Sequence, residues 1–143
     1  MNIFSIFLAF LAGALGSTQA GINSMLGKSA GQFAMVAFVS LIQVVISLAF
    51  MVFRHEFKPL SGATWGWIGA SALLGVIIMI SVSHSISSIG SLPVFVLLVL
   101  GQVILSAVIN HFGWFGSPRS PITLQKAGSI SLILIGVLLL ARS

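Results

Sequence analysis

The chain alternates long apolar runs with short polar or glycine-containing breaks, and this pattern predicts five membrane-spanning helices. Because an α-helix rises 1.5 Å per residue, about 20 apolar residues cross the hydrocarbon core of a bilayer. The apolar runs occupy residues 3–22, 33–53, 65–85, 92–112 and 124–141. No segment of 20–50 residues repeats along the chain, so we expect a single all-α transmembrane domain that covers residues 1–143.

The middle of the chain is apolar over a length that exceeds one helix. Between Pro59 and Pro118 the sequence contains no Asp, Glu, Lys or Arg. A tight hairpin is expected within this stretch, where turn-forming and small polar residues gather. These residues are Ser87, Ser88, Gly90, Ser91 and Pro93. Pro93 is tolerated at the start of the fourth helix, because its missing N–H falls in the first turn.

Composition supports lipid as the surroundings of the chain. Of the 143 residues, 58% are hydrophobic and 5% are charged, whereas soluble domains carry about 25% charged residues. The first apolar run is expected to be a retained span rather than a cleaved signal peptide. It lacks a preceding Lys or Arg, and it is longer than the apolar region of most signal peptides.

The charged residues are basic and scattered, which favours a role in membrane orientation over nucleic-acid binding. The chain has six Lys and Arg residues and one acidic residue, Glu56. Each basic residue lies near the end of an apolar run rather than in a continuous patch. Five crossings place Arg54, Lys58, Arg119 and Lys126 on the side of the N-terminus, and Lys28 and Arg142 on the other. This count predicts a cytoplasmic N-terminus, although so small a difference also permits insertion in both orientations. Lys126, beside the start of the fifth run, is expected to extend its ammonium toward the interface.

Polar side chains within the apolar runs are the candidates for binding a solute, because such groups in hydrocarbon need a partner or a cavity. The candidate substrate-binding residues are Gln19, Asn23, Gln43, His84, Gln102, Ser106 and Asn110. Gln19 and Asn23 share one helix face, and Gln102, Ser106 and Asn110 form a stripe at intervals of four residues. Uncharged hydrogen-bonding groups in this pattern suit a small polar or amphipathic solute. The alternative is that they join helices, at about 0.6 kcal/mol per contact.

Small residues form a second pattern on the first span, and they predict close helix packing. Ala9, Gly13 and Ser17 recur every four residues, as do Gly16 and Ala20. This spacing lets two helix backbones approach each other closely. We therefore expect a packing face here rather than a binding site.

No arrangement of residues indicates an enzyme, a metal site or a cofactor. The chain has no Cys and no Asp, and its only carboxylate side chain is Glu56, so neither a catalytic triad nor a pair of carboxylates can form. Three His residues without nearby acids make a poor metal site. His84 and His111 could relay protons at membrane depth, but an interfacial, hydrogen-bonded histidine is the favoured interpretation of both.

Two motifs in the sequence resemble those of a known family. The first is Gly13-Ala14-Leu15-Gly16-Ser17-Thr18-Gln19-Ala20-Gly21-Ile22-Asn23, followed by Leu26-Gly27. The second is Gly101-Gln102, then Ser106, then Asn110-His111-Phe112-Gly113-Trp114-Phe115-Gly116, followed by Pro118, Pro121, Gly128 and Gly136. With these motifs the chain resembles the YdcZ-like family of short bacterial inner-membrane proteins, within the drug/metabolite transporter superfamily.

The resemblance implies an architecture that one chain does not complete. Ten-helix members of the superfamily look like two inverted five-helix halves, with the substrate site near the midplane between them. A five-helix chain resembles one half and would need a partner in the opposite orientation. The resemblance thus implies an antiparallel homodimer, or a pair with a paralogue.

The resemblance also implies a function, namely transport of a small molecule by alternating access. The family usually looks like Asp-His-Phe-Gly where this chain has Asn110-His111-Phe112-Gly113. Since the spans then hold no carboxylate, a facilitator or an exchanger is favoured over a proton-driven pump. The alternative is a non-transporting membrane scaffold or accessory subunit, in which the polar stripes only join helices.

Overall fold

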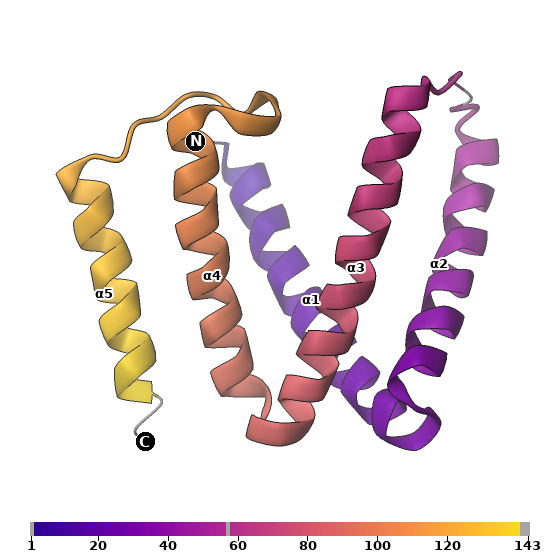
Figure 1. Ribbon diagram of the computed structural model, residues 1–143, viewed down its shortest axis with the longest axis horizontal. Helices are drawn as coiled ribbons and strands as arrows, with labels where there is room; N and C mark the ends of the chain where they lie inside the picture. Colours follow the sequence, from indigo (N-terminus) through magenta and orange to yellow (C-terminus); the bar gives the residue numbers. More distant parts are fainter. Residues whose placement is uncertain (1, 57, 141–143) are drawn as a thin grey trace. The chain divides into compact units, whose positions relative to one another are not determined.

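The computed structural model describes residues 2–56 and 58–140, which fold into helices and connecting segments without any strand (Figure 1). The elements are α1 (Ile3–Ala30), α2 (Gln32–Phe53), α3 (Gly62–Ile89), α4 (Ser91–Phe112), the short 3₁₀ helix η1 (Trp114–Gly116) and α5 (Leu124–Leu140). The all-α class expected from the sequence is confirmed. The chain divides into two compact units, residues 1–88 and 89–143, and each is described by itself.

Four of the helices are long and apolar enough to cross a membrane. These are α1, α2, α3 and α4, whereas α5 is a shorter apolar helix of 17 residues. At 1.5 Å per residue α5 is about 26 Å long, slightly less than the hydrocarbon core. Large hydrophobic side chains cover the outside of the helices, for example Phe10 at 75% and Phe50 at 65% exposure. Such a surface belongs in lipid, and the protein is a multi-pass membrane protein.

In the first unit, α1 is longer than the apolar run that predicts it. The side-chain Oδ1 of Asn2 accepts a hydrogen bond from the Phe4 N–H at 3.1 Å and caps its start. The helix then continues beyond Ile22 to Ala30, because residues 23–30, although less apolar than the run before them, contain no proline. It ends at Gly31, whose φ of 92° suits glycine far better than other residues.

The single residue Gly31 separates α1 from α2, and the two helices approach closely there. A Cβ added to Gly27 would lie 2.7 Å from the side-chain oxygen Oε1 of Gln32. The absence of a side chain at Gly27 therefore makes room for the Gln32 amide at the turn. Met35 and Val36, in the first turns of α2, are buried.

The expected break in the central apolar stretch is confirmed. Helix α3 ends at Ile89 and α4 begins at Ser91, with Gly90 between them at a φ of 83°. Pro93 is the third residue of α4, so its missing N–H falls in the first turn, as expected.

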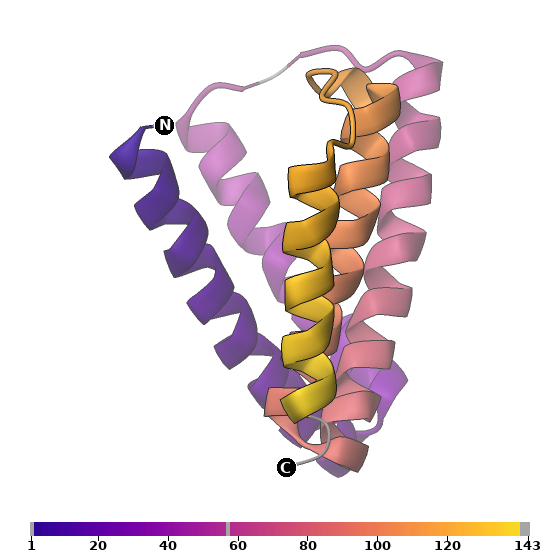
Figure 2. The same ribbon diagram turned by 90° about the vertical axis from the view of Figure 1, so that its left-hand side faces the viewer.

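In the second unit, α4 and α5 pack along each other and are joined by a segment that contains η1 (Figures 1 and 2). Gly113 ends α4 in the left-handed conformation, with a φ of 70° and a ψ of 32°. The last residue of the fifth expected span, Ala141, lies outside the described residues, and so does Arg142 of the charge count.

Candidate functional site

The polar stripe on α4 borders a pocket in the second unit. Gln102, Ser106 and Asn110 are spaced four apart on one helix, and all three line this pocket. Its volume is about 610 Å³, within the range of about 300–1,000 Å³ that small-molecule sites occupy. The structure thus brings these three candidates of the sequence analysis together.

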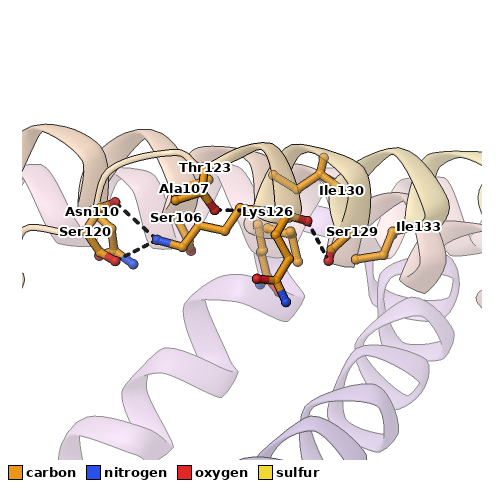
Figure 3. A pocket seen from close by; sticks show the side chains of 12 residues that line it. Ser106, Ala107, Asn110, Ser120, Thr123, Lys126, Ser129, Ile130 and Ile133 are labelled. Carbon is orange, nitrogen blue, oxygen red and sulfur yellow. Dashed lines mark hydrogen bonds between the residues drawn. The ribbon is translucent and has the colours of Figure 1, made fainter.

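Helix α5 and the segment before it supply most of the remaining lining, and α4 adds two apolar residues. The polar residues from α5 and this segment are Ser120, Thr123, Gln125, Lys126 and Ser129. The apolar lining consists of Val103, Ala107, Ile130 and Ile133. Figure 3 shows these side chains between the two helices, with the Lys126 ammonium directed toward Ser120. The lining near the connecting segment is therefore polar, and the lining further along the two helices is mixed, with Val103, Ile130 and Ile133 alongside Gln102 and Ser129.

Lys126 is the one charged residue of the pocket lining, and its ammonium is held by oxygen atoms. The Nζ atom donates to Ser120 Oγ at 2.6 Å, to the Pro121 carbonyl oxygen at 2.9 Å and to the Ser120 carbonyl oxygen at 3.4 Å. All three acceptors are uncharged. The side chain reaches back toward the connecting segment, which is the direction expected for a lysine that seeks the interface.

The position of Lys126 in α5 is electrostatically unfavourable. Thr123 precedes the helix, and its Oγ1 accepts a hydrogen bond from the Lys126 N–H at 3.3 Å. Lys126 thus lies in the first turn, where the helix dipole disfavours a cation by about 0.3–1 kcal/mol. The contacts of the ammonium with Ser120 and Pro121 offset this cost.

Two hydrogen bonds donated by backbone N–H groups hold the connecting segment against the end of α4. The Ser120 N–H donates to the Asn110 carbonyl oxygen at 2.8 Å. The Ile122 N–H donates to His111 Nδ1 at 3.2 Å, so this ring nitrogen is an acceptor and carries no proton in this arrangement. These bonds position Ser120, and through it the Lys126 ammonium, at the mouth of the pocket.

Three aromatic side chains pack against one another at the end of α4. The rings of Phe112 and Trp114 are stacked, with centroids 5.3 Å apart and an angle of 19° between their planes. The His111 and Phe112 rings are nearly perpendicular, with centroids 4.9 Å apart. His111 therefore has a structural role at the helix end, in keeping with the hydrogen-bonded histidine favoured by the sequence analysis.

The other candidates lie in the first unit. Gln19, Gln43 and His84 are exposed, on α1, α2 and α3 respectively. Asn23 is 6% exposed, although its neighbour on the same helix face, Gln19, is not buried. A role of these four residues in solute binding stays a prediction.

Asn23 lies at a contact of α1 with α3 that is rich in serine. Ser83 Oγ donates to the Asn23 carbonyl oxygen at 3.1 Å, and the hydroxyls of Ser24 and Ser87 are 3.0 Å apart. Ser87 Oγ also donates to the Ser83 carbonyl oxygen at 3.0 Å. These polar groups join helices, which is the alternative role that the sequence analysis gave to such residues.

The small residues of α1 face open space within the described chain. A Cβ at Gly13 or Gly16 would meet nothing within 4 Å. Ser17 donates to the Gly13 carbonyl oxygen of its own helix at 3.0 Å. Ala9 is exposed, and Ala20 is partly exposed. The packing face formed by these residues therefore stays a prediction, and a partner for it would have to be a second chain or another part of this one.

Sequence reasoning missed the contribution of α5 to the pocket. Gln125 and Ser129 are four residues apart, and Lys126 lies on the same side of the helix start. This polar face was a usable signal, but Lys126 was interpreted only as a residue of the interface. Ser120 and Thr123 could not be assigned, because the path of the connecting segment places them.

Among residues 2–56 and 58–140, no group of three His, Asp or Glu side chains lies close enough together to hold a metal ion. The ionisable group of the pocket lining is that of Lys126. Hydrogen bonding and charge, rather than covalent chemistry, are what this arrangement offers a ligand.

Apolar spanning helices and an open, partly polar pocket define the class of multi-pass membrane proteins that handle small solutes. Residues 4–139 match the family described as "Putative inner membrane exporter, YdcZ", and the chain belongs to this family. Its place is thus among membrane transporters of the inner membrane, a kind of protein distinct from enzymes. No curated protein and no solved structure matches the chain.

Proposed function

We propose that this chain is the transport subunit for a small polar or amphipathic solute, which binds in the pocket between α4 and α5. The observation that carries the proposal is the stripe of Gln102, Ser106 and Asn110 on the wall of a pocket of about 610 Å³. These residues lie on a helix long and apolar enough to span the membrane. Membership of an exporter family supports the same function.

The transporting species in this proposal is a dimer that works by alternating access. A five-helix chain corresponds to one half of an inverted-repeat transporter, and two halves enclose a site that opens to either side in turn. The open face at Gly13 and Gly16 offers a surface for the partner. The partner is a second copy in the opposite orientation or a paralogue. The charge count favours a cytoplasmic N-terminus for the major orientation, with both orientations permitted.

Energy coupling in this proposal does not use a carboxylate within the spans. Glu56 is the only acidic side chain of the sequence, and its Oε1 lies 3.8 Å from Arg54 Nε in the segment after α2. A facilitator or an exchanger fits this composition better than a proton-driven pump. The family description favours the outward direction, which an exchanger achieves by admitting another solute.

Flux into sealed liposomes tests the proposal directly. Purified protein, alone and with its paralogue, would be reconstituted and offered a panel of labelled small metabolites. We expect flux of at least one solute, reduced about fivefold by Gln102→Leu or Ser106→Ala, since each removes a hydrogen bond worth roughly 1 kcal/mol. The matched control is Ser131→Ala, because Ser131 bonds the Ala127 carbonyl oxygen of its own helix and does not line the pocket.

A second function, that of a scaffold or accessory subunit, is favoured by the bonds of Ser83 with Asn23 and of Ser87 with Ser24, because these polar groups join helices in this chain. Replacing Gln19 and Gln102 with Leu separates the two functions. Transport predicts intact assembly and lost flux. Lost assembly would support the scaffold and contradict transport. The same conclusion would follow if the unmodified protein showed no flux and the substitutions changed neither assembly nor flux.

A further inference from the structure

The charge of the pocket is not neutralised by the chain. Lys126 lines the pocket, and its ammonium contacts only the uncharged oxygens of Ser120 and Pro121. The one acidic side chain in the sequence, Glu56, belongs to the other unit and lies beside Arg54. The ammonium is thus hydrogen-bonded but carries its full positive charge into a site within an apolar protein.

An unneutralised charge in such a site favours an anion as its partner. Separation of an ammonium from bulk water is costly, and an opposite charge is what best offsets this cost. The hydroxyl of Ser120, 2.6 Å from Nζ, can turn its own hydrogen toward the same anion. The amide of Asn110 and the hydroxyl of Ser106 add further donors in the pocket.

The rest of the lining indicates the body of the ligand. Ile130 and Ile133 line the pocket one turn and two turns beyond Lys126 on α5, and Val103 and Ala107 line it from α4 (Figure 3). These side chains offer an apolar surface next to the charged end. A ligand that matches both parts has an anionic group at one end and an apolar body at the other.

We infer that the pocket selects ligands with a carboxylate or phosphate group attached to an apolar body, with Lys126 as the residue that recognises the anion. This inference rests on the proposed function, because it names the chemical class of the solute that the same pocket takes. The anionic group can come from a soluble amphiphile or from a lipid headgroup, and the experiment below distinguishes these two sources.

Three probes of similar size and different charge measure the selectivity. They are 4-phenylbutyrate, 4-phenylbutylamine and 4-phenylbutanol. Binding would be measured by calorimetry on purified protein in phosphatidylcholine nanodiscs, with empty nanodiscs as the reference. We expect the carboxylate to bind about 30-fold more tightly than the alcohol, and the amine not to bind. Equal affinity for all three probes, or preference for the amine, would overturn the inference.

Substitutions then test the role of the charge itself. Lys126→Gln is expected to weaken phenylbutyrate binding about 30-fold, because the partly buried charge pair with the carboxylate is lost. Lys126→Arg keeps the charge and should stay within about threefold. Arg119→Gln is the matched control, since Arg119 carries the same charge in the segment just before α5 and does not line the pocket. Unchanged binding by Lys126→Gln would refute the inference.

Asn110→Asp provides a second variant that leaves Lys126 in place. The Ser120 N–H bonds the backbone carbonyl of residue 110, so the hydrogen bond that orders the segment does not depend on this side chain. The new carboxylate would supply a counter-charge in the pocket and should reduce phenylbutyrate binding at least as much as Lys126→Gln does. If Lys126→Gln fails to fold, this variant still decides, because undiminished binding would contradict the inference.

Adding phosphatidylglycerol to the nanodiscs identifies the source of the anion. If phosphatidylglycerol competes with phenylbutyrate and this competition disappears in Lys126→Gln, the pocket is assigned to a lipid headgroup. If phenylbutyrate binding is insensitive to this lipid, the pocket is assigned to a soluble amphiphile. Flux measurements separate this inference from the proposed function. Lys126-dependent binding without flux would leave the inference standing and contradict transport. Flux of neutral solutes without anion binding would support transport and contradict the inference.

Discussion

Ser83 on α3 donates its hydroxyl hydrogen to the backbone carbonyl oxygen of Asn23 on α1, with 3.1 Å between the two oxygens. Ser83 is 0% exposed, so the contact is fully enclosed by the first unit. One turn further along α3, the Ser87 hydroxyl lies 3.0 Å from the hydroxyl of Ser24, the residue that follows Asn23 on α1. Hydroxyl groups, rather than charged residues, therefore join these two helices.

Replacement of Ser83 should destabilise the first unit in proportion to the size of the new side chain. We expect Ser83→Ala to lower the free energy of unfolding by about 0.6 kcal/mol, the typical value for a polar contact between membrane helices. Ser83→Leu should lower it by about 1–3 kcal/mol, because the enclosed site has no room for extra carbon atoms. Unfolding in mixed micelles would measure both. Ser131→Ala, at an exposed position, should change the value by less than about 0.5 kcal/mol.

Gly27 should tolerate a large side chain poorly, since the Gln32 amide occupies the space beside it. We expect Gly27→Leu to reduce the free energy of unfolding by about 1–3 kcal/mol through displacement of this amide. Gly69→Leu serves as the control, because a Cβ at Gly69 meets nothing within 4 Å. Equal stability of the two variants in the same micelle titration would show that the turn after α1 is not closely packed.

His111 should protect the Ile122 amide from exchange with solvent. In the variant His111→Phe the Ile122 N–H loses its acceptor, and a hydrogen bond of this kind contributes roughly 1 kcal/mol. We therefore expect amide exchange at residue 122 to accelerate about fivefold. Hydrogen exchange followed by mass spectrometry would measure it. His84→Phe, on the exposed surface of α3, should leave this amide unchanged, and an equal effect of both substitutions would argue against a specific bond.

The small-residue face of α1 should be required for assembly and not for folding of the single chain. We expect Gly13→Leu and Gly16→Leu each to shift the protein from dimer to monomer, because they prevent close approach of helix backbones. Their side chains would enter open space within the chain, so helix content should be retained. Light scattering on purified protein in detergent measures the mass. Gly136→Leu, on α5, is the control, and loss of the dimer in this variant as well would implicate general surface bulk.

Orientation in the membrane can be measured with single cysteines, because the natural sequence contains none. Ser29 lies near the turn after α1, and Ser61 lies before α3. We expect Ser61→Cys to be labelled mostly from the cytoplasmic face and partly from the other, and Ser29→Cys to show the opposite distribution. Labelling of each position from one face only would exclude an antiparallel homodimer and favour a partner of different sequence.

The helices could be predicted from the sequence because hydrophobicity alone determines which segments enter a bilayer. The break at Gly90 was predictable for a similar reason, since small polar residues and a glycine coincide there. The end of α1 was not, because apolar character stops near Ile22 while the helix continues until the positive φ of Gly31 ends it. Polarity indicated where the apolar run ends, and backbone conformation decided where the helix ends.

The candidate site was only half accessible to the same reasoning. The stripe of Gln102, Ser106 and Asn110 follows from helical periodicity, and all three residues line the pocket. The contact of Lys126 with Ser120 depends on the non-helical path between α4 and α5, which includes the left-handed Gly113. No periodic pattern encodes such a path.

The two kinds of connection between the helices have a practical consequence for proteolysis. Helices α1 and α2 are joined by Gly31 alone, and α3 and α4 by Gly90 alone, whereas longer non-helical segments follow α2 and α4. The trypsin sites Arg54 and Arg119 fall in those longer segments, whereas Lys58 precedes Pro59, before which trypsin cleaves poorly. Trypsin added to sealed vesicles should therefore cut after Arg54 and Arg119 only in molecules whose longer segments face outward, and the fraction left uncut at these two sites would report the ratio of the two orientations without any engineered residue.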